Sequence, residues 1–387
     1  MGSLDYYNIE ELLTDEERAA CARARRFVQE EAAPEIVPCH RAAKFPEHLI
    51  TRIGALRFYA PYLKEHGCAG LSYTAYGLIM QELEQADSGL RSLASVQGAL
   101  AIQAIHSFGS PEQHARWLPG LVSGERVGCF ALTEQEHGSD PGGMETRAKR
   151  EGEHYVLTGS KCWIGNASIA DIKVVWAKDD DGRVGGFVVE KDAPGFRARD
   201  IEGKFSLRMS RTSECWFDNC RIPAENRLPR AVGLRAPLSC LSYARVGIAW
   251  GVIGAAIDCY ETALAYAKGR EQFGRPIASF QLVQQKLVWM AQEITKAQLL
   301  ALRLTRLMED GAARPAQISL AKRNNVWMAL QCARKARDIL GAAGITDQYS
   351  VIRHVMNLES VSTYEGTHDI HTLTVGRDIT GLNAFVG

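Results

Sequence analysis

Two patterns of apolar residues divide the chain into three parts. Near both ends, apolar residues return every three or four positions over long stretches, which is typical of amphipathic helices. The unbroken pattern at 282–309 predicts one long helix of a helical bundle. Between 130 and 235, short β-branched and aromatic runs alternate with turn pairs such as Asp181-Gly182, which predicts a small antiparallel β domain.

The composition is that of a globular protein with no overall electrostatic field. Of 387 residues, 46% are hydrophobic and 23% are charged, and 45 Lys and Arg balance 45 Asp and Glu. Balanced charge favours neither a nucleic acid nor a membrane surface as partner, so an anionic ligand needs local arginines. The acidic N-terminus is not a secretory signal, and no uninterrupted apolar run approaches the roughly 18 residues of a membrane span.

The cysteines and histidines give no metal-ligand pattern. The ten cysteines are scattered without a Cys-x-x-Cys pair, which is typical of reduced thiols in the cytoplasm. His368 and His371 are three residues apart and share a face if they are helical, but the sequence puts no third ligand nearby. We therefore expect a cytoplasmic protein without a metal site.

One carboxylate near the C-terminal end stands out. In the segment TYEGTHDIHTLTVGRDITGL, Glu365 lies between an aromatic residue and a glycine. Glu365 is either a first-turn helix residue favoured by the helix dipole, with Thr367 or Asp369 as a cap, or a residue that does chemistry. The local sequence leaves both interpretations open.

An arginine in the N-terminal part is expected to be buried. Three poor helix-interior residues at 87–89 predict a break between two helices. In the second helix, Arg91 and Ser95 are four apart and share a face with apolar neighbours. A buried arginine requires a carboxylate, which either Glu84 or a bound ligand supplies.

Three further segments have two interpretations each. The loop at 131–148 holds three glycines with several hydroxyl groups, and it is either a ligand loop or a plain surface loop. Trp163, beside a turn, is either a core aromatic or a flat wall against a ligand ring. Arg270 and Arg275 flank Phe273 and either bind a pyrophosphate and an adenine or are simply solvated.

Taken together, seven segments in this order resemble the acyl-CoA dehydrogenase family, and glutaryl-CoA dehydrogenases most closely, along essentially the whole chain. They are ADSGLRSLASVQ, GSDPGGMETRA, GKFSLRMS, QFGRPIASFQLVQQKL, SLAKRNN, ARKARDILG and VIRHVMNLESVSTYEGTHDIH. The resemblance implies an α+β multidomain fold: an N-terminal α-helical domain at 1–129, a central antiparallel β-barrel at 130–235 and a C-terminal four-helix bundle at 236–387. It also implies a homotetramer with one FAD per subunit.

The same resemblance implies roles for individual residues. Glu365 becomes the catalytic base that removes the α-proton of an acyl thioester, whose carbonyl oxygen is held by the backbone N–H of Glu365 and by FAD. Arg91 becomes the group that holds the distal carboxylate of glutaryl-CoA, and Tyr364 matches a tyrosine of the decarboxylating members, which form crotonyl-CoA and pass electrons to an electron-transferring flavoprotein. The implied substrate-binding residues are Arg91, Glu84, Ser95, Val96, Ser139 and Arg245. The implied FAD-binding residues are Phe130, Leu132, Thr133, Ser139, Trp163, Gly165, Thr367 and Asp369, with Arg270, Gln272, Phe273 and Gly341 reaching the FAD of a neighbouring subunit.

Three departures from the family pattern keep alternatives open. Gly165 replaces the usual hydroxyl residue near the flavin, which suggests O2 as an electron acceptor. Ala342 and Ala343 crowd the loop at Gly341. The segment 135–137 replaces a Pro-containing stretch, which suggests a carrier-protein-bound or other dicarboxylic acyl thioester in a biosynthetic pathway, without decarboxylation. A flavin oxidase or monooxygenase and an FAD-free structural homologue are the remaining alternatives.

Overall fold

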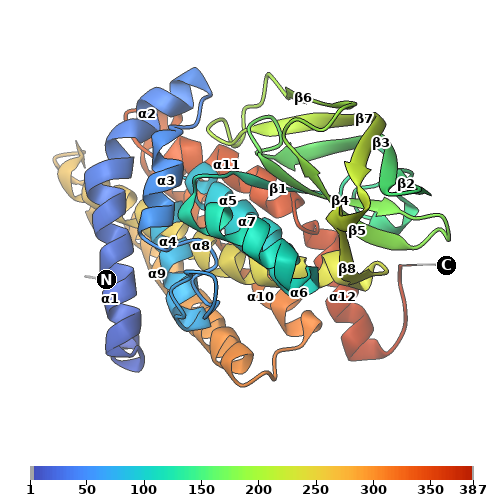
Figure 1. The fold of residues 1–387 in the computed structure, drawn as a ribbon. Coiled ribbons are helices and arrows are strands. Elements are labelled where there is room, and N and C mark those ends of the chain that lie inside the picture. Colours follow the sequence, from blue (N-terminus) through green and yellow to red (C-terminus); the bar gives the residue numbers. More distant parts are fainter. Residues whose placement is uncertain (1–3, 386–387) are drawn as a thin grey trace.

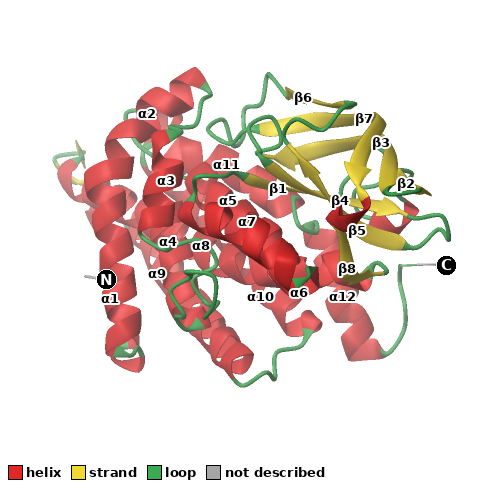
Figure 2. Ribbon diagram, viewed as in Figure 1, coloured by secondary structure: helices red, strands yellow, loops and turns green. Residues whose placement is uncertain are grey.

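The computed structural model describes residues 4–385 and has the fold class that the sequence predicts. Helices come first, a large sheet follows, and helices return toward the C-terminus (Figure 1). The strands of the large sheet lie together on one side of the molecule, and most helices lie on the other (Figure 2). The domain boundaries at 129 and 235 stay a prediction; the first strand begins at Gly128 and the first helix after the sheet begins at Arg235.

The helices before the sheet begin at residues suited to capping them. Thr14 and Ser110 each form a capping box with the residue three positions later, and Ser72 accepts a hydrogen bond from the backbone of Ala75. Short π-helical segments at 28–32 and 96–102 join α1 to α2 and α5 to α6. The bounds are α1 (Asp15–Phe27), α2 (Ala33–Ala42), α3 (His48–Ala55), α4 (Tyr73–Ala86), α5 (Ser88–Ser95), α6 (Gln103–Phe108) and α7 (Pro111–Ser123).

The sheet corrects two details of the predicted β domain. Its order is β6-β7-β3-β2-β4-β5-β8, with β1 added beside β4, and it is not closed as a barrel because its edge strands β6 and β8 do not pair. It is also mixed, since β4 pairs in parallel with both β1 and β2. The bounds are β1 (Gly128–Ala131), β2 (Arg147–Glu151), β3 (His154–Gly165), β4 (Ile172–Lys178), β5 (Val184–Glu190), β6 (Phe196–Asp200), β7 (Thr212–Pro223) and β8 (Arg227–Val232).

The C-terminal helices pack around one central helix. Helix α8 contacts α4, α9, α10 and α11, and α9 confirms the long helix predicted at 282–309. A short hairpin, formed by β9 (Glu271–Gln272) and β10 (Arg275–Pro276), follows α8. The bounds are α8 (Arg235–Gly269), α9 (Gln281–Glu309), α10 (Pro315–Ile339), α11 (Val351–Thr363) and α12 (His368–Thr380).

Glycines let α8 and α4 pack with almost no gap. A Cβ atom added at Gly247 would lie 2.3 Å from the hydroxyl of Tyr76, and one added at Gly254 would lie 1.9 Å from the carbonyl oxygen of Gln81. Helix α8 is long and apolar enough to cross a membrane by length and composition, but 78% of its most apolar window is buried inside the protein. Its apolar character is thus accounted for by its central place in the core.

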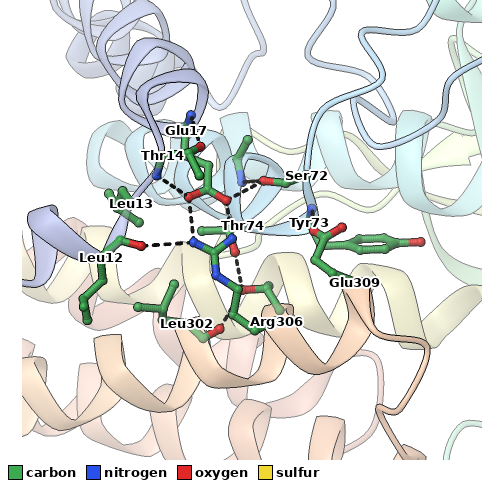
Figure 3. Close-up of polar contacts among 12 residues, drawn as sticks. Leu12, Leu13, Thr14, Glu17, Ser72, Tyr73, Thr74, Leu302, Arg306 and Glu309 are labelled. Carbon is green, nitrogen blue, oxygen red and sulfur yellow. Dashed lines mark hydrogen bonds and ion pairs between the residues drawn. The ribbon is translucent and has the colours of Figure 1, made fainter.

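A buried carboxylate fastens α1 to the rest of the helical layer (Figure 3). Glu17 of α1 accepts a hydrogen bond of 2.8 Å from Nη2 of Arg306 on α9 and another of 2.8 Å from the hydroxyl of Ser72 at the start of α4. Thr74 and Thr305 join α4 to α9 beside this contact, with their hydroxyls 2.7 Å apart. The ion pair and its neighbours lower the pKa of Glu17, which stays ionised although it is buried.

We expect Gly254→Ala to destabilise the protein by about 1–3 kcal/mol, because the added methyl group overlaps a backbone oxygen that cannot rotate away. Gly269→Ala, in the last turn of the same helix, is the matched control, since a Cβ there has nothing within 4 Å. Thermal unfolding midpoints measure both. An equal effect of the two substitutions would show that close packing against α4 is not what Gly254 provides.

Candidate active site

The turn between α11 and α12 holds Glu365 outside any helix. Glu365 has φ 53° and Gly366 has φ 95°, so two consecutive residues adopt left-handed backbone conformations. Thr367 is the N-cap of α12 and accepts a hydrogen bond of 3.1 Å from the backbone of Ile370. The interpretation of Glu365 as a first-turn helix residue is therefore wrong, whereas Thr367 as a cap is confirmed.

Two cationic side chains fix this turn through its carbonyl groups. Nζ of Lys322, on α10, donates to the carbonyl oxygens of Tyr364 at 2.9 Å and Gly366 at 2.8 Å. Nε of Arg245, on α8, donates to the carbonyl oxygen of Glu365 at 2.8 Å. Three successive carbonyls are thus held by side-chain nitrogen donors, which stabilises the strained backbone.

Among residues 4–385, the carboxylate of Glu365 has no hydrogen-bond partner. Its Oε2 atom is buried and unpaired, although the residue as a whole is partly exposed. Burial raises the pKa of Glu365, while the charges of Arg91, Arg245 and Lys322 oppose that shift. An unpaired carboxylate with a raised pKa is suited to accept a proton from a substrate.

Arg91 is almost fully buried and has the partner that the sequence suggests. Its Nε donates to Oε2 of Glu84 at 2.8 Å, and its Nη2 donates to the hydroxyl of Tyr364. Its guanidinium carbon also lies 5.6 Å from the centre of the Tyr364 ring. Gly251 of α8 makes room for this pair, since a Cβ there would lie 2.2 Å from Glu84 Oε2. Arg91 therefore connects α4 and α5 to the residue beside Glu365.

The helix break at 87–89 separates α4 from α5 and so sets the position of Arg91 relative to the turn that holds Glu365. Helix α4 ends at Ala86, and Asp87 caps α5 by accepting a hydrogen bond of 2.7 Å from the backbone of Gly89. The other oxygen of Asp87 accepts a hydrogen bond of 2.9 Å from Asn357 on α11. The predicted break is confirmed, and it ties α5 to the helix that ends one residue before Tyr364.

Among the described residues, Oε1 of Glu84 is also buried without a hydrogen-bond partner, and the buried hydroxyl of Ser95 lies beside the phenol of Tyr76. Ser95 lies on the same helix as Arg91, as its spacing predicts. Buried polar atoms without partners are uncommon, and they are expected where a polar ligand is bound. The polar atoms of the candidate site therefore continue from Glu84 along α5 to Ser95.

Strand β3 offers an exposed aromatic ring near its C-terminal end. Trp163 lies at an irregularity in the pairing of β3 with β7, has φ 62° and is 56% exposed, so it is not a core residue. Gly165, two residues on, faces Val96, because a Cβ there would lie 3.3 Å from a methyl group of Val96. The β3 strand thus approaches the helix that carries Arg91.

Buried residues and a buried ion pair hold the first part of the loop at 131–148 in place. Phe130 and Leu132 are buried, and the carbonyl of Thr133 accepts a hydrogen bond of 2.9 Å from the backbone of Cys162. A buried ion pair of 2.9 Å joins Lys161 to Glu134, which lowers the pKa of Glu134 to about 2. The outer part of the loop is exposed, including Ser139, Gln135 and Glu136.

Four predicted cofactor residues lie far from Glu365 along the molecule. Arg270 caps the end of α8, and Gln272 and Phe273 belong to the β9–β10 hairpin that follows it, at the end of α8 opposite the sheet (Figure 1). The 35 residues of α8 span about 50 Å. Gly341 begins an exposed turn after α10, and Phe273 is 95% exposed. Within residues 4–385 this group is separate from the site around Glu365.

Lys322, which holds the carbonyls on both sides of Glu365, was not predicted from the sequence. It lies on the buried face of α10 with Ile318, Val326 and Ala329. A lysine among apolar residues at helical spacing was the available signal, because a buried lysine needs partners. Burial lowers the pKa of Lys322 to about 7, and the nearby Glu365 partly offsets this shift.

An open sheet that lies between two groups of helices along the chain is the arrangement of the acyl-CoA dehydrogenase fold. Models of the N-terminal, middle and C-terminal domains of acyl-CoA dehydrogenase match residues 14–125, 129–220 and 231–380. The chain belongs to the acyl-CoA dehydrogenase family.

Solved structures and curated relatives agree with the family models. A glutaryl-CoA dehydrogenase from Mycobacterium smegmatis has a TM-score of 0.96 and 53% identity over 97% of each chain. A glutaryl-CoA dehydrogenase from Mycobacterium smegmatis in complex with FADH2 has a TM-score of 0.97 and 47% identity over 99% of each chain. The mitochondrial short-chain specific acyl-CoA dehydrogenase of Mus musculus is 32% identical over 357 residues, which are 91% of this chain and 87% of that protein.

We expect Lys322→Met to cost more stability at pH 9 than at pH 6. The variant leaves two carbonyls without a donor, at about 1–3 kcal/mol for each, at either pH. The folded-state pKa of Lys322, about 7, lies below the ordinary value of 10.5. Between these two pH values the unfolded chain binds more protons than the folded protein, so the stability due to Lys322 rises with pH. Thermal unfolding at the two pH values measures the difference. Lys268→Met, at an exposed position of α8, is the control, and an equal loss at both pH values for Lys322→Met would contradict the prediction.

Proposed function

We propose that this protein uses FAD to oxidise glutaryl-CoA between its α- and β-carbons and then decarboxylates the product to crotonyl-CoA. The observation that carries the proposal is the contact of buried Arg91 with Tyr364, directly beside the unpaired carboxylate of Glu365. The 53% identity with a glutaryl-CoA dehydrogenase supports the same substrate class.

In this proposal Glu365 is the base that removes the α-proton of the thioester. The proton becomes acidic enough only if the carbonyl oxygen receives hydrogen bonds as the enolate forms, and the backbone N–H of Glu365 is the protein's proposed donor. Lys322 and Arg245 keep the backbone of this turn in place. The raised pKa of Glu365 reduces the difference between the pKa of the base and that of the substrate's α-proton.

Arg91 and Tyr364 recognise the distal carboxylate and set up the second reaction. Oxidation gives a glutaconyl thioester whose carboxylate is attached to the γ-carbon. When the bond between the carboxylate carbon and the γ-carbon breaks, CO2 leaves. The electron pair of that bond is delocalised into the thioester as a dienolate. Glu365, now protonated, returns its proton to the γ-carbon and forms the crotonyl thioester.

The residues present fit a bound FAD. Trp163 exposes a flat ring near the end of β3, two residues before Gly165, which faces Val96, and this ring suits the isoalloxazine. The exposed Phe273 with Arg270 suits the adenine and pyrophosphate of an FAD in a neighbouring subunit, and Gly341 has open space where a Cβ would project. When bound, FAD accepts the hydride from the β-carbon. Thr367 and Asp369, at the start of α12, complete the proposed FAD contacts within one subunit.

We further propose a cytoplasmic homotetramer that passes electrons to an electron-transferring flavoprotein. Gly165 supplies no hydroxyl near the flavin, which favours reaction with O2 as the alternative. Exposed Gln135 and Glu136 leave room for a carrier protein as the alternative to CoA. Turnover of glutaryl-CoA with and without O2, and with and without an external acceptor, distinguishes the two acceptors.

The first experiment mixes FAD-loaded protein with glutaryl-CoA under anaerobic conditions and follows the loss of flavin absorbance. We expect bleaching, with crotonyl-CoA and CO2 as products by mass spectrometry. Glu365→Gln should slow bleaching about 10²–10⁴-fold, because it removes the base without changing the size of the side chain. In the wild-type protein the rate should fall as the pH drops through the raised pKa, since only the ionised carboxylate accepts the proton.

Glu359→Gln is the matched control, because Glu359 is an exposed residue on α11 that pairs with Arg334. It should leave the bleaching rate within about twofold of wild type, since an exposed ion pair contributes about 0–1 kcal/mol. Absence of bleaching with glutaryl-CoA in a wild-type protein that holds FAD would reject the proposed substrate.

Arg91→Lys keeps the positive charge near Glu84 but loses the fork-shaped set of donors. We expect kcat/KM for glutaryl-CoA to fall about 10- to 100-fold, which corresponds to one lost charged hydrogen bond, while kcat/KM for butyryl-CoA, which has no distal carboxylate, changes much less. Arg334→Lys, at an exposed position, is the control. An equal loss for both substrates would show that Arg91 has only a structural role.

A further inference from the structure

Three histidines that are far apart in the sequence come together in the N-terminal helical domain. His66 follows Glu65 in the connection between α3 and α4, His106 is in α6, and His114 is in α7. The ring centres lie 5.1 Å apart for His66 and His114, 5.7 Å for His66 and His106, and 5.9 Å for His106 and His114. This cluster has no part in the chemistry proposed for Glu365.

The cluster presents metal-ligand atoms that have no other partner. One ligand atom each from Glu65, His66 and His106 lies within 4.8 Å of the other two. Nε2 of His66 and Nδ1 of His106 are buried and have no hydrogen-bond partner, and Nε2 of His66 lies 3.5 Å from Oε2 of Glu65. Buried nitrogen atoms without a partner carry a desolvation cost that a bound cation would remove.

We propose that Glu65, His66 and His106 bind a divalent transition-metal ion, and that the ion is zinc. Two imidazoles and one carboxylate form a donor set that zinc accepts readily. Zinc–ligand distances of about 2.0–2.2 Å place tetrahedral ligand atoms about 3.3–3.6 Å apart, so the three atoms need to close by about 1 Å. Rotation of the exposed Glu65 side chain supplies part of that movement.

A fourth ligand from His114 requires its ring to move, because its nitrogen atoms are not among the ligand atoms that lie within 4.8 Å of one another. Its Nε2 lies 3.0 Å from the carbonyl oxygen of Ile105, and a proton on Nε2 leaves Nδ1 as the free atom. Metal-ligating histidines commonly donate their second ring nitrogen to such a group.

Some of the surrounding charges favour a bound cation, and one disfavours it. His106 lies in the last turn of α6, where the carbonyl ends of the helix favour a cation. Arg230 on β8, whose Nη2 donates to the carbonyl oxygen of Gly109 at 2.6 Å, disfavours one. The carboxylate of Glu65 offsets this charge, so Glu65 is as necessary to the site as the two histidines.

A bound ion would fasten the connection between α3 and α4 to α6. His66 has φ 57°, a left-handed conformation that this connection must hold. Four residues earlier, Tyr62 donates a hydrogen bond of 2.8 Å to Gln103 of α6 and stacks on Tyr243 of α8 at 5.5 Å. The site therefore acts as a structural clamp on a segment that reaches the core beside α8.

The test uses the full-length, tag-free protein with FAD, stripped with a chelator and then titrated calorimetrically with ZnCl2. We expect one ion per chain, a higher thermal unfolding midpoint with zinc, and the visible absorption of tetrahedral Co2+ when CoCl2 replaces ZnCl2. His106→Gln and Glu65→Gln should each weaken zinc binding at least tenfold. Circular dichroism and FAD content show that both variants are folded.

His48→Gln, at an exposed position at the start of α3, is the matched control and should bind zinc as the wild type does. No binding at one equivalent per chain in the wild-type protein would overturn the proposal. Binding that persists unchanged in both His106→Gln and Glu65→Gln would also overturn it, because the ion would then be held elsewhere, for example by the partly exposed thiol of Cys39.

Discussion

The candidate active site depends on keeping one buried carboxylate unpaired among cations that are close to it. Lys322 and Arg245 donate to the carbonyls of the turn, and Arg91 donates to Glu84 and Tyr364. Each cation therefore lowers the electrostatic cost of an ionised Glu365 without a hydrogen bond to Oε2. A direct ion pair would lower the pKa of the carboxylate and make it a weaker base.

That arrangement requires the helices to approach one another very closely. Glu84 and Arg91 come from α4 and α5, Arg245 from α8, and Lys322 from α10. The absence of a side chain at Gly251 lets Glu84 lie against α8. The core therefore does more than stabilise the fold, because its small residues set how near the charged groups lie to the turn that they hold.

The sequence predicted the order of helices, sheet and helices, the helix break at 87–89 and the burial of Arg91 beside a carboxylate, because these depend on local spacing and on the cost of a buried charge. It left open whether Glu84 or a bound ligand supplies that carboxylate. It did not predict the open, mixed sheet, since strand pairing joins segments far apart in the chain. The direction of Trp163 depends on an irregularity between β3 and β7, which leaves no local signal. The roles of the individual residues around Glu365 remain predictions.

The backbone at position 365 also limits how this site can evolve. With φ 53°, the position disfavours β-branched side chains and tolerates Gly, Asn and Asp best. Of these only Asp carries a carboxylate, and its side chain is one methylene shorter than that of Glu. A descendant protein that lost Glu365 could keep a carboxylate in this turn most easily as Asp, with a shorter reach, so the turn restricts which substitutions the site accepts as well as its chemistry.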